Sequence, residues 1–320
     1  MKRLLTTMAV SAVALSSIGA VHTAGAEEAQ LKAASFLPGR VVFAKYFYDW
    51  VAEVNKQCAG KIKISVVGPA AISSLEQWNA LKSGVVDMHY GPAGYMRGAM
   101  PAGDVITVAQ NGPPEQRRNG ARDLLVAKFK EQMNAVYLTH IFDGVKFYVY
   151  TTKPAKDARF DGFRLRAVPL YYSFFRSLGA TPVRMGAPQV YTALERRTVD
   201  GFGWPLYGVN DFGWHKFVKY RYGPGFFNTA VPIIVNLDRY NKLDPAQQKC
   251  LQDMALWLDK KWPEWRAAED ARQAERQKAA GIKYVELGAK FSQAAEDLYW
   301  ADLAKGDPDF VKKIRPLLTK

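Results

Sequence analysis

Apolar and polar positions along the chain follow two periods, which predict helices and strands in turn. After residue 39, apolar residues recur at the spacing of one helix face. These residues are Phe43, Phe47, Trp50, Val51 and Val54. Residues 61–67 alternate with a period of two, as a strand does. A capping box at Ser73–Glu76 predicts a helix through Leu81, and residues 85–89 predict another strand. This order predicts an α/β fold with a mostly parallel sheet.

One pattern occurs twice with identical internal spacing. An aromatic residue is followed by Ala-Leu, then by Val-Asp, and then by Pro, first from Trp78 to Pro92 and again from Tyr191 to Pro205. In each copy a predicted helix runs into a short strand whose carboxyl end opens into a glycine-containing loop. Two related α/β domains explain this repeat better than a chance match.

Two apolar strands are candidates for connecting these domains. Residues 145–150 would carry the chain out of the first domain, and residues 231–235 would carry it back. A helix is predicted to begin at Asp244-Pro245, and residues 262–280 have opposite charges at helical spacing. We therefore expect a hinge of ordered strands and a helix instead of a flexible tether.

The N-terminal segment has the pattern of a secretory signal peptide. Lys2 and Arg3 precede a mostly apolar stretch that carries no charge, and Ala24-Gly25-Ala26 is a small-x-small cleavage pattern. Serine and threonine residues interrupt the apolar stretch, which disfavours a permanent membrane anchor. We expect cleavage after Ala26, export to the periplasm, and a mature chain of residues 27–320.

Charge and motifs narrow the function further. The formal net charge is +14, but lysine and arginine are scattered along the sequence instead of forming a nucleic-acid-binding arm. The excess is either a solvated positive surface or an attraction for anionic ligands. His89, His140 and His215 show no metal-ligand spacing, and nucleophile and phosphate-loop motifs are missing. We expect no enzyme activity, no cofactor, no metal and no nucleic-acid partner.

The mature chain has two cysteines, Cys58 and Cys250. Neither lies in a CxxC motif or another metal-type spacing. An oxidising compartment allows a disulfide between them, and two buried free thiols are the alternative.

The strand predicted at residues 163–167 contains the strongest polar candidate. Period-two alternation places Arg164 and Arg166 on one face, with Arg166 nearer the carboxyl end, where open α/β sheets collect ligands. A guanidinium group can hold a carboxylate with two parallel hydrogen bonds. The alternative role for Arg166 is a surface salt bridge.

Several segments together resemble a known family of receptors. They are residues 160–166, 178–183, 190–194 and Val199-Asp200-Gly201, and the similarity extends over nearly all of the mature chain. These segments resemble the solute receptors of tripartite ATP-independent periplasmic (TRAP) transporters, of the dicarboxylate-receptor type. The resemblance implies a two-lobed periplasmic binding protein of α/β class, type II-like, with crossing strands and a long hinge-spanning helix.

The resemblance also divides the chain. We expect lobe I to comprise residues 27–147 and 236–262, and lobe II to comprise residues 148–235. Residues 263–320 would form the long helix and C-terminal helices that pack on both lobes.

By this resemblance, Arg166 occupies the position of the arginine that holds the ligand carboxylate. The sequence departs from the family elsewhere: Trp204 replaces an asparagine, and Phe147 replaces a second arginine. Lys146 or Arg184 would aid the remaining arginine. The further candidates for ligand contact are Tyr90, Phe226, Asn228, Gln189, Arg184 and Tyr207.

The expected ligand follows from these departures. One end would be a carboxylate held by Arg166, and an aromatic or branched apolar remainder would lie against Trp204. We expect a monomeric receptor that delivers this monocarboxylate to the membrane subunits of a TRAP permease. The alternatives are a receptor that feeds a sensor kinase or chemoreceptor, and a periplasmic enzyme on a similar scaffold.

Overall fold

The computed structural model describes residues 27–319. The predicted signal peptide, residues 1–26, lies outside the described residues. Within residues 27–319, the structure has no helix that is both long and apolar enough to cross a membrane.

The first sheet has the strand order β2-β1-β3-β10-β4. Its strands are β1 (Ala29–Ser35), β2 (Ile62–Val67), β3 (Met88–Tyr90), β4 (Ala135–Ile141) and β10 (Val231–Asn236). Strand β1 runs parallel to β2 and β3, whereas β10 runs antiparallel to β3 and β4. The apolar side chains of residues 62–67 alternate as predicted, because only one face of β2 is buried.

The second sheet has the order β11-β9-β5-β8-β6-β7. Its strands are β5 (Lys146–Thr151), β6 (Arg164–Ala167), β7 (Thr181–Arg184), β8 (Gly201–Pro205), β9 (Tyr220–Asn228) and β11 (Lys283–Glu286). Strand β6 is parallel to β7 and β8, and β5 is antiparallel to β8 and β9.

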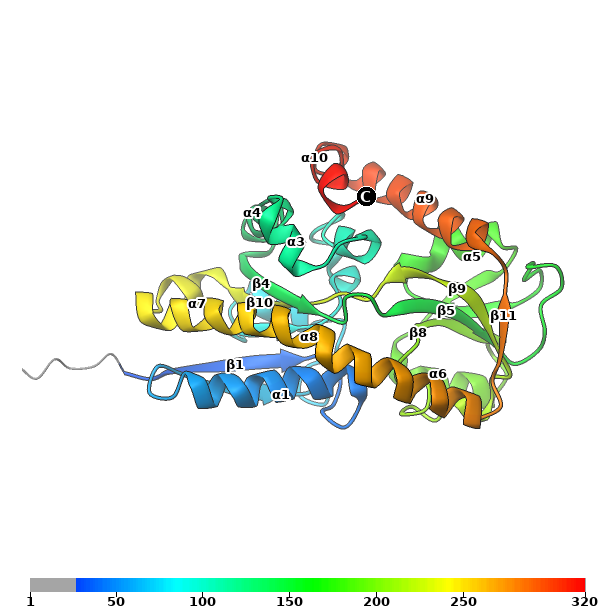
Figure 1. The fold of residues 1–320 in the computed structure, drawn as a ribbon, viewed down its shortest axis with the longest axis horizontal. Helices are drawn as coiled ribbons and strands as arrows, with labels where there is room; N and C mark the ends of the chain where they lie inside the picture. Colours follow the sequence, from blue (N-terminus) through cyan, green and yellow to red (C-terminus); the bar gives the residue numbers. More distant parts are fainter. Residues whose placement is uncertain (1–26, 320) are drawn as a thin grey trace, which may run out of the picture.

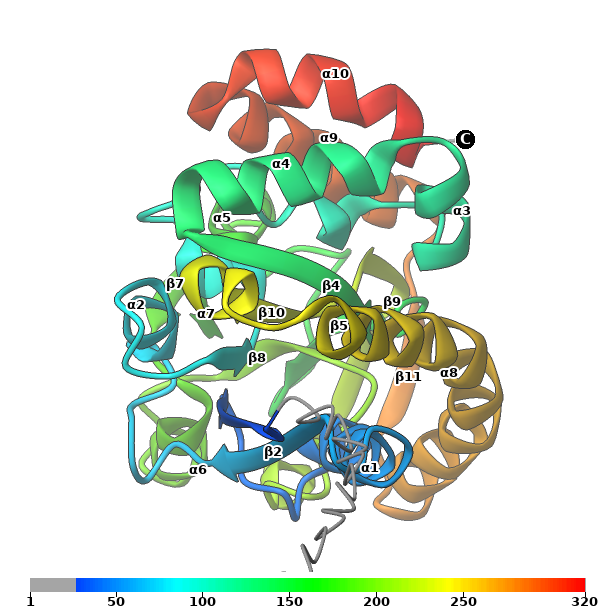
Figure 2. The ribbon, with the colours of Figure 1, turned by 90° about the vertical axis from the view of Figure 1, so that its left-hand side faces the viewer.

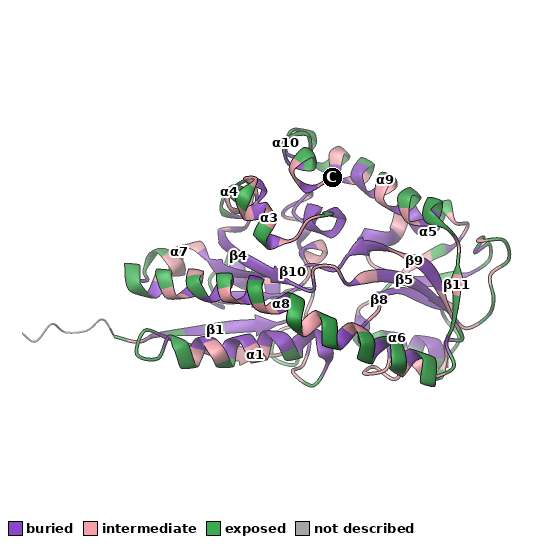
Figure 3. Ribbon diagram, viewed as in Figure 1, coloured by how far each residue is buried: buried purple, intermediate pink, exposed green. Residues whose placement is uncertain are grey.

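Helices cover both sheets, and their exposed faces lie on the outside of the molecule (Figure 3). The α-helices are α1 (Val42–Gln57), α2 (Gln77–Lys82), α3 (Pro113–Arg118), α4 (Ala121–Met133), α5 (Tyr172–Ser177), α6 (Ala187–Glu195), α7 (Leu237–Asn241), α8 (Pro245–Ala279), α9 (Ala289–Gly306) and α10 (Pro308–Leu318). Short 3-10 helices are η1 (Ala93–Met96), η2 (Val105–Val108), η3 (Pro169–Tyr171) and η4 (Trp214–Lys216). Figure 2 shows α9 and α10 stacked over α4.

The two sheets form two lobes that lie side by side (Figure 1). The chain leaves the first sheet after β4, enters the second at β5, and returns through β9 into β10. Helix α8 runs along both lobes (Figure 1). The predicted two-lobed α/β fold with crossing strands and a long spanning helix is therefore confirmed. Both sheets are mixed and not mostly parallel as predicted, because the crossing strands β10 and β5 pair antiparallel with their neighbours.

Four boundaries differ from the prediction. Residues 146–147, assigned to lobe I, begin β5 of the second sheet, where β5 pairs with β8 and β9. Residues 231–235, assigned to lobe II, lie in β10 of the first sheet, because they fill the gap between β3 and β4. The expected division at residue 263 falls inside α8, which continues past Pro263. The capping box at residue 73 does not form. Helix α2 begins only at Gln77, and its N-cap residue is Glu76, which makes no side-chain cap. Residues 73–76 form a turn instead: the Glu76 N–H donates to the Ser73 carbonyl (2.8 Å), and the Ser74 hydroxyl donates to the Phe36 carbonyl (2.7 Å).

The sequence repeat has a structural counterpart in both lobes. The Asp87 carboxylate accepts a hydrogen bond from the backbone N–H of Lys32, which belongs to the neighbouring strand β1 (2.7 Å). The Asp200 carboxylate accepts the equivalent bond from the N–H of Arg164 in β6 (2.8 Å). Each Asp therefore ties the start of its strand to the adjacent parallel strand, so the two copies have the same structural role.

Helix α8 is strongly capped and packs on the crossing segment. The Asp244 carboxylate accepts from the N–H groups of Ala246 and Gln247, and the Gln247 side chain bonds back to the Asp244 N–H. Near the middle of α8, the Trp262 indole donates to the carbonyl of Asp143 (2.8 Å). Gly144 has a φ of 83°, in the left-handed region that favours glycine, and a Cβ atom there would also displace the Arg266 guanidinium of α8.

The hydrophobic side chains form two clusters, and each contains residues of both lobes. One cluster includes Leu31 of lobe I and Phe202 of lobe II, and the other includes Phe129 and Phe175. The lobes are therefore packed against each other in a closed arrangement. A disulfide joins Cys58, at the end of α1, to Cys250 in α8, with their Cα atoms 6.1 Å apart.

Candidate ligand-binding site

A cavity of about 70 Å³ lies between the lobes. Its apolar wall combines side chains from both lobes: Phe36, Phe43, Phe147, Val168, Leu170 and Trp204. Its polar side chains are Tyr95, Thr107, Arg166, Tyr171 and Thr229. Pro92 and Pro205, the last residues of the two sequence repeats, also line it. The two repeats therefore converge on this cavity from opposite lobes.

Arg166 is the one charged residue in the cavity lining of the described chain, and it is 1% exposed. Strand β6 places it at the cavity. Its Nε atom donates to the Met185 carbonyl (3.0 Å), and its Nη1 atom donates to the Gly203 carbonyl (3.4 Å). The guanidinium lies 5.3 Å from the centre of the Trp204 ring. Two carbonyls and an aromatic face thus fix the group in one orientation.

The buried Arg166 lacks an anionic partner. None of the ion pairs in residues 27–319 includes it, and its Nη2 atom is buried without a hydrogen-bond partner. The phenols of Tyr95 and Tyr171 lie nearby: burial raises the pKa of both, and the Arg166 charge opposes that rise. A buried cation without a counter-charge is costly, so this geometry favours an anion in the cavity.

Trp204 lines the cavity as expected, but its polar atom is already in use. The indole N–H donates to the carbonyl of Tyr207 (2.9 Å). The ring packs edge-on against Trp214 (4.9 Å between centroids) and against Phe43 of the other lobe (5.8 Å). Trp204 can therefore offer a ligand only its apolar ring, while the same ring supports Arg166.

Phe147 also lines the cavity, where β5 leaves the crossing segment. Its ring lies 5.6 Å from that of Tyr171 and is 8% exposed. Arg166, Trp204 and Phe147 are thus the three predicted site residues that the structure brings together.

The other predicted aromatic contacts are not in the cavity lining, because each packs elsewhere. Tyr90 stacks on Phe47 (4.4 Å) and donates its hydroxyl to the Phe43 carbonyl, so it holds α1 on the sheet. Phe226 packs against Phe174 (4.9 Å). The Tyr207 hydroxyl donates to Asp270 of α8 (2.6 Å).

The predicted polar contacts are also away from the cavity wall. The Asn228 side chain bonds the Gly144 N–H and Asp143, so it fixes the crossing segment. The Gln189 side chain is exposed and accepts from the Gly186 N–H at the start of α6 (2.9 Å). Arg184 is exposed at the end of β7, and neither it nor Lys146 lines the cavity.

Sequence reasoning missed Phe43, Tyr95, Thr107, Tyr171 and Thr229. The helical periodicity of Phe43 predicts a core residue and gives no sign of a place at the cavity. The 3-10 turns that position Tyr95, Thr107 and Tyr171 have no periodicity to read. The sequence signal that could have located these residues is the end of each repeat, at Pro92 and Pro205, because both prolines line the cavity. Tyr95 lies only three residues beyond Pro92.

The sequence matches the family model described as bacterial extracellular solute-binding protein, family 7, over residues 36–305. This chain belongs to that family. The resemblance to TRAP solute receptors is therefore confirmed. The family is extracytoplasmic, which agrees with the expected periplasmic location, and its members are solute-binding receptors.

Individual relatives are distant in sequence. The 2,3-diketo-L-gulonate-binding periplasmic protein of Escherichia coli is 22% identical over 298 residues, which cover 85% of this chain and 86% of that protein. A TRAP transporter solute-binding protein of Bordetella bronchiseptica, with calcium and picolinate bound, has a TM-score of 0.80 at 20% identity; 91% of each chain is covered. A Bordetella pertussis solute receptor that binds pyroglutamic acid has a TM-score of 0.79 at 18% identity, covering 91% of this chain and 99% of that one.

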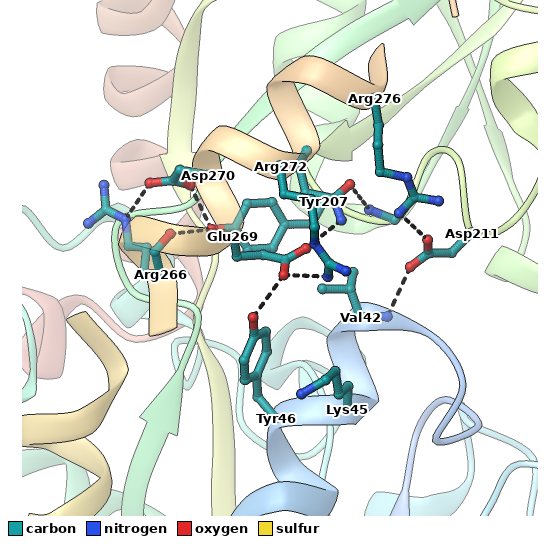
Figure 4. A network of polar contacts seen from close by, with 12 residues as sticks. Val42, Lys45, Tyr46, Tyr207, Asp211, Arg266, Glu269, Asp270, Arg272 and Arg276 are labelled. Atoms are coloured by element: carbon teal, nitrogen blue, oxygen red, sulfur yellow. Dashed lines mark hydrogen bonds and ion pairs between the residues drawn. The ribbon is translucent and has the colours of Figure 1, made fainter. Parts of the chain in front are cut away.

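This solute-binding protein also has polar contacts that join its lobes beside the cavity (Figure 4). The Asp211 carboxylate, from the loop after β8 in lobe II, accepts from the N–H of Val42 in lobe I (3.0 Å). It also accepts from Arg276 near the end of α8 (2.7 Å). Val41, the N-cap residue of α1, provides no side-chain cap, so Asp211 caps this helix from the opposite lobe.

We expect Asp211→Ala to weaken ligand binding about five- to thirtyfold. The closed arrangement would lose a helix cap and a charge-assisted bond, together about 1–2 kcal/mol, while the open arrangement loses less. Calorimetry and dissociation rates measure this, and the loss should lie mainly in faster dissociation.

The matched control is Asp49→Ala, also a carboxylate beside α1. Within residues 27–319, Asp49 forms an ion pair with Lys45 alone, on the same exposed helix face, so affinity should be unchanged. Equal affinities of the Asp211 variant and the unaltered protein would show that the Asp211 contacts do not stabilise closure.

Proposed function

We propose that this solute-binding protein captures a small organic monocarboxylate between its lobes and passes it to a TRAP permease. The observation that carries the proposal is the buried, unpaired Arg166 in an otherwise uncharged cavity. A carboxylate there would satisfy the free Nη2 atom and neutralise the cation. One cation supports one carboxylate, since a second would be buried without a counter-charge.

The wall of the cavity supports an apolar body for the ligand. Phe36, Phe43, Phe147 and the Trp204 ring present apolar surface, which favours a branched or planar remainder. The cavity is small, with a volume of about 70 Å³. This size favours short acids over bulky sugar acids. Picolinate and pyroglutamic acid, found in two of the relatives, are both compact monocarboxylates.

Partner and location complete the proposal. Export would use residues 1–26 as a cleaved signal peptide, and the monomeric receptor would present its closed form to the permease membrane subunits. Pull-down with those subunits tests this pairing and separates it from a receptor for a sensor kinase.

The direct test of ligand class combines two measurements. Mass spectrometry of the denatured, purified protein identifies any small molecule that co-purified. A thermal-shift panel then compares aromatic and branched monocarboxylates with succinate, malate, D-glucuronate and sialic acid. Compact monocarboxylates should raise the melting temperature most. If only the dicarboxylates or the sugar acids raise it, the proposed ligand class is wrong.

A further inference from the structure

Within residues 27–319, two fully buried polar atoms of the cavity wall have no hydrogen-bond partner. One is the Arg166 Nη2 atom, which the proposed carboxylate would satisfy. The other is the hydroxyl of Thr229, which is buried and makes no hydrogen bond. Thr229 itself is only 4% exposed. A buried hydroxyl without a partner is destabilising, and such groups in native proteins are usually satisfied by water or a ligand.

The backbone around Thr229 is held firmly. Its N–H donates to the Val145 carbonyl (2.8 Å), which joins the returning and outgoing crossing segments. The preceding residue, Asn228, bonds the Gly144 N–H and Asp143 through its side chain. The hydroxyl is thus attached to the hinge itself, at a fixed place between the lobes.

A second threonine supports the same interpretation from lobe I. Thr107 of η2 also lines the cavity, and no side-chain hydrogen bond in residues 27–319 involves its hydroxyl. The remaining cavity surface is largely apolar. The neutral side chains that could form a hydrogen bond with a ligand are therefore the two threonines and the tyrosines Tyr95 and Tyr171.

We infer that Thr229 is a specificity-determining residue, which selects monocarboxylates that carry a second, neutral hydrogen-bonding group such as a hydroxyl or oxo oxygen. This inference rests on the proposed function, because it takes the carboxylate to be held by Arg166. A hydroxyl oxygen on the ligand would satisfy the Thr229 side chain, whereas a methyl group in its place would leave that side chain unpaired.

Three ligand pairs of matched size test the inference, each with a hydroxyl or a methyl at one position. The pairs are lactate with 2-methylpropanoate, 3-hydroxybutanoate with 3-methylbutanoate, and 4-hydroxybutanoate with pentanoate. Calorimetry should show that one hydroxy acid binds about tenfold or more tightly than its partner. Thr229→Val should reduce this preference to less than about twofold, with little change for the methyl partner. Thr229→Ser, which keeps the hydroxyl, should retain the preference.

Thr181→Val, a change of the same type at an exposed position in β7, is the control and should alter neither member of a pair. The inference is overturned if no hydroxy acid is preferred, or if the preference survives in Thr229→Val. It is also overturned if only Thr107→Val abolishes the preference. In these cases tight binding of the methyl partners would leave the proposed function intact. Failure of every monocarboxylate to bind would instead contradict the proposed function itself.

Discussion

Arg166→Met is expected to weaken monocarboxylate binding by about 2–5 kcal/mol, a factor of roughly 30 to several thousand. The ligand carboxylate would lose its only buried counter-charge, because no other charged residue of the described chain lines the cavity. Arg166→Lys should also bind poorly. An ammonium group cannot reproduce the planar fork that reaches Met185, Gly203 and the ligand together. Isothermal calorimetry measures both losses.

The same substitution should leave the ligand-free protein at least as stable. Arg166 has no acidic partner, so its burial costs free energy that an unbranched apolar side chain of similar length avoids. We therefore expect the melting temperature without ligand to be unchanged or higher, while the ligand-induced shift disappears. This combination distinguishes a lost binding group from a misfolded protein.

Arg164→Met is the matched control, since it removes an arginine two residues earlier on the same strand. Arg164 is exposed and pairs with Asp200 (3.6 Å), away from the cavity. Its affinity should stay within about twofold of the unaltered protein. Near-normal binding by both Arg166 variants would remove Arg166 from the site.

The second large effect concerns stability. Replacing both Cys58 and Cys250 with alanine should lower the free energy of unfolding by about 2–5 kcal/mol. The two cysteines are 192 residues apart in sequence, so the bond encloses every strand of the second sheet except β11 and restricts the unfolded chain strongly. The chain-entropy model places the upper value near 5 kcal/mol for a loop of this length. Denaturant unfolding under non-reducing conditions measures the difference.

Ligand affinity should not change in the double variant, because both sulfur atoms lie in lobe I between α1 and α8. Reductant should destabilise the unaltered protein and leave the double variant unaffected. A non-reducing peptide map in which both cysteines are alkylated would contradict the bond.

Local patterns predicted much of the fold correctly. The period of two at residues 62–67 and the helical period from Phe43 to Val54 have strong one-sided burial, so they survive any tertiary arrangement. The two Val-Asp repeats predict paired domains, and each Asp ties two parallel strands together. The helix start at Asp244 was correct because its cap uses only neighbouring residues.

Predictions were wrong where the contacts of a residue are made with a segment far away in the sequence. Ser73 and Glu76 have the spacing of a capping box, but residues 73–76 form a turn that the Ser74 hydroxyl ties to the Phe36 carbonyl, 38 residues away. Three aromatic residues near the predicted cleft pack elsewhere in the structure. Tyr90 packs against α1, Tyr207 bonds to α8, and Phe226 packs against Phe174. Composition could not separate these buried packing residues from the ones that line the cavity.

The sequence by itself determined the alternation of helices and strands, the repeat and the family, and it singled out Arg166 as the candidate for the ligand carboxylate, because each depends on local spacing or on a matched motif. Only the tertiary structure decided which groups share the cavity. In the tertiary structure, Arg166 lies where no acidic residue of the described chain pairs with it. The Trp204 indole N–H donates to a carbonyl, and the Thr229 hydroxyl has no hydrogen-bond partner within residues 27–319. These properties arise from contacts between segments far apart in the chain, and no local pattern encodes where two lobes meet.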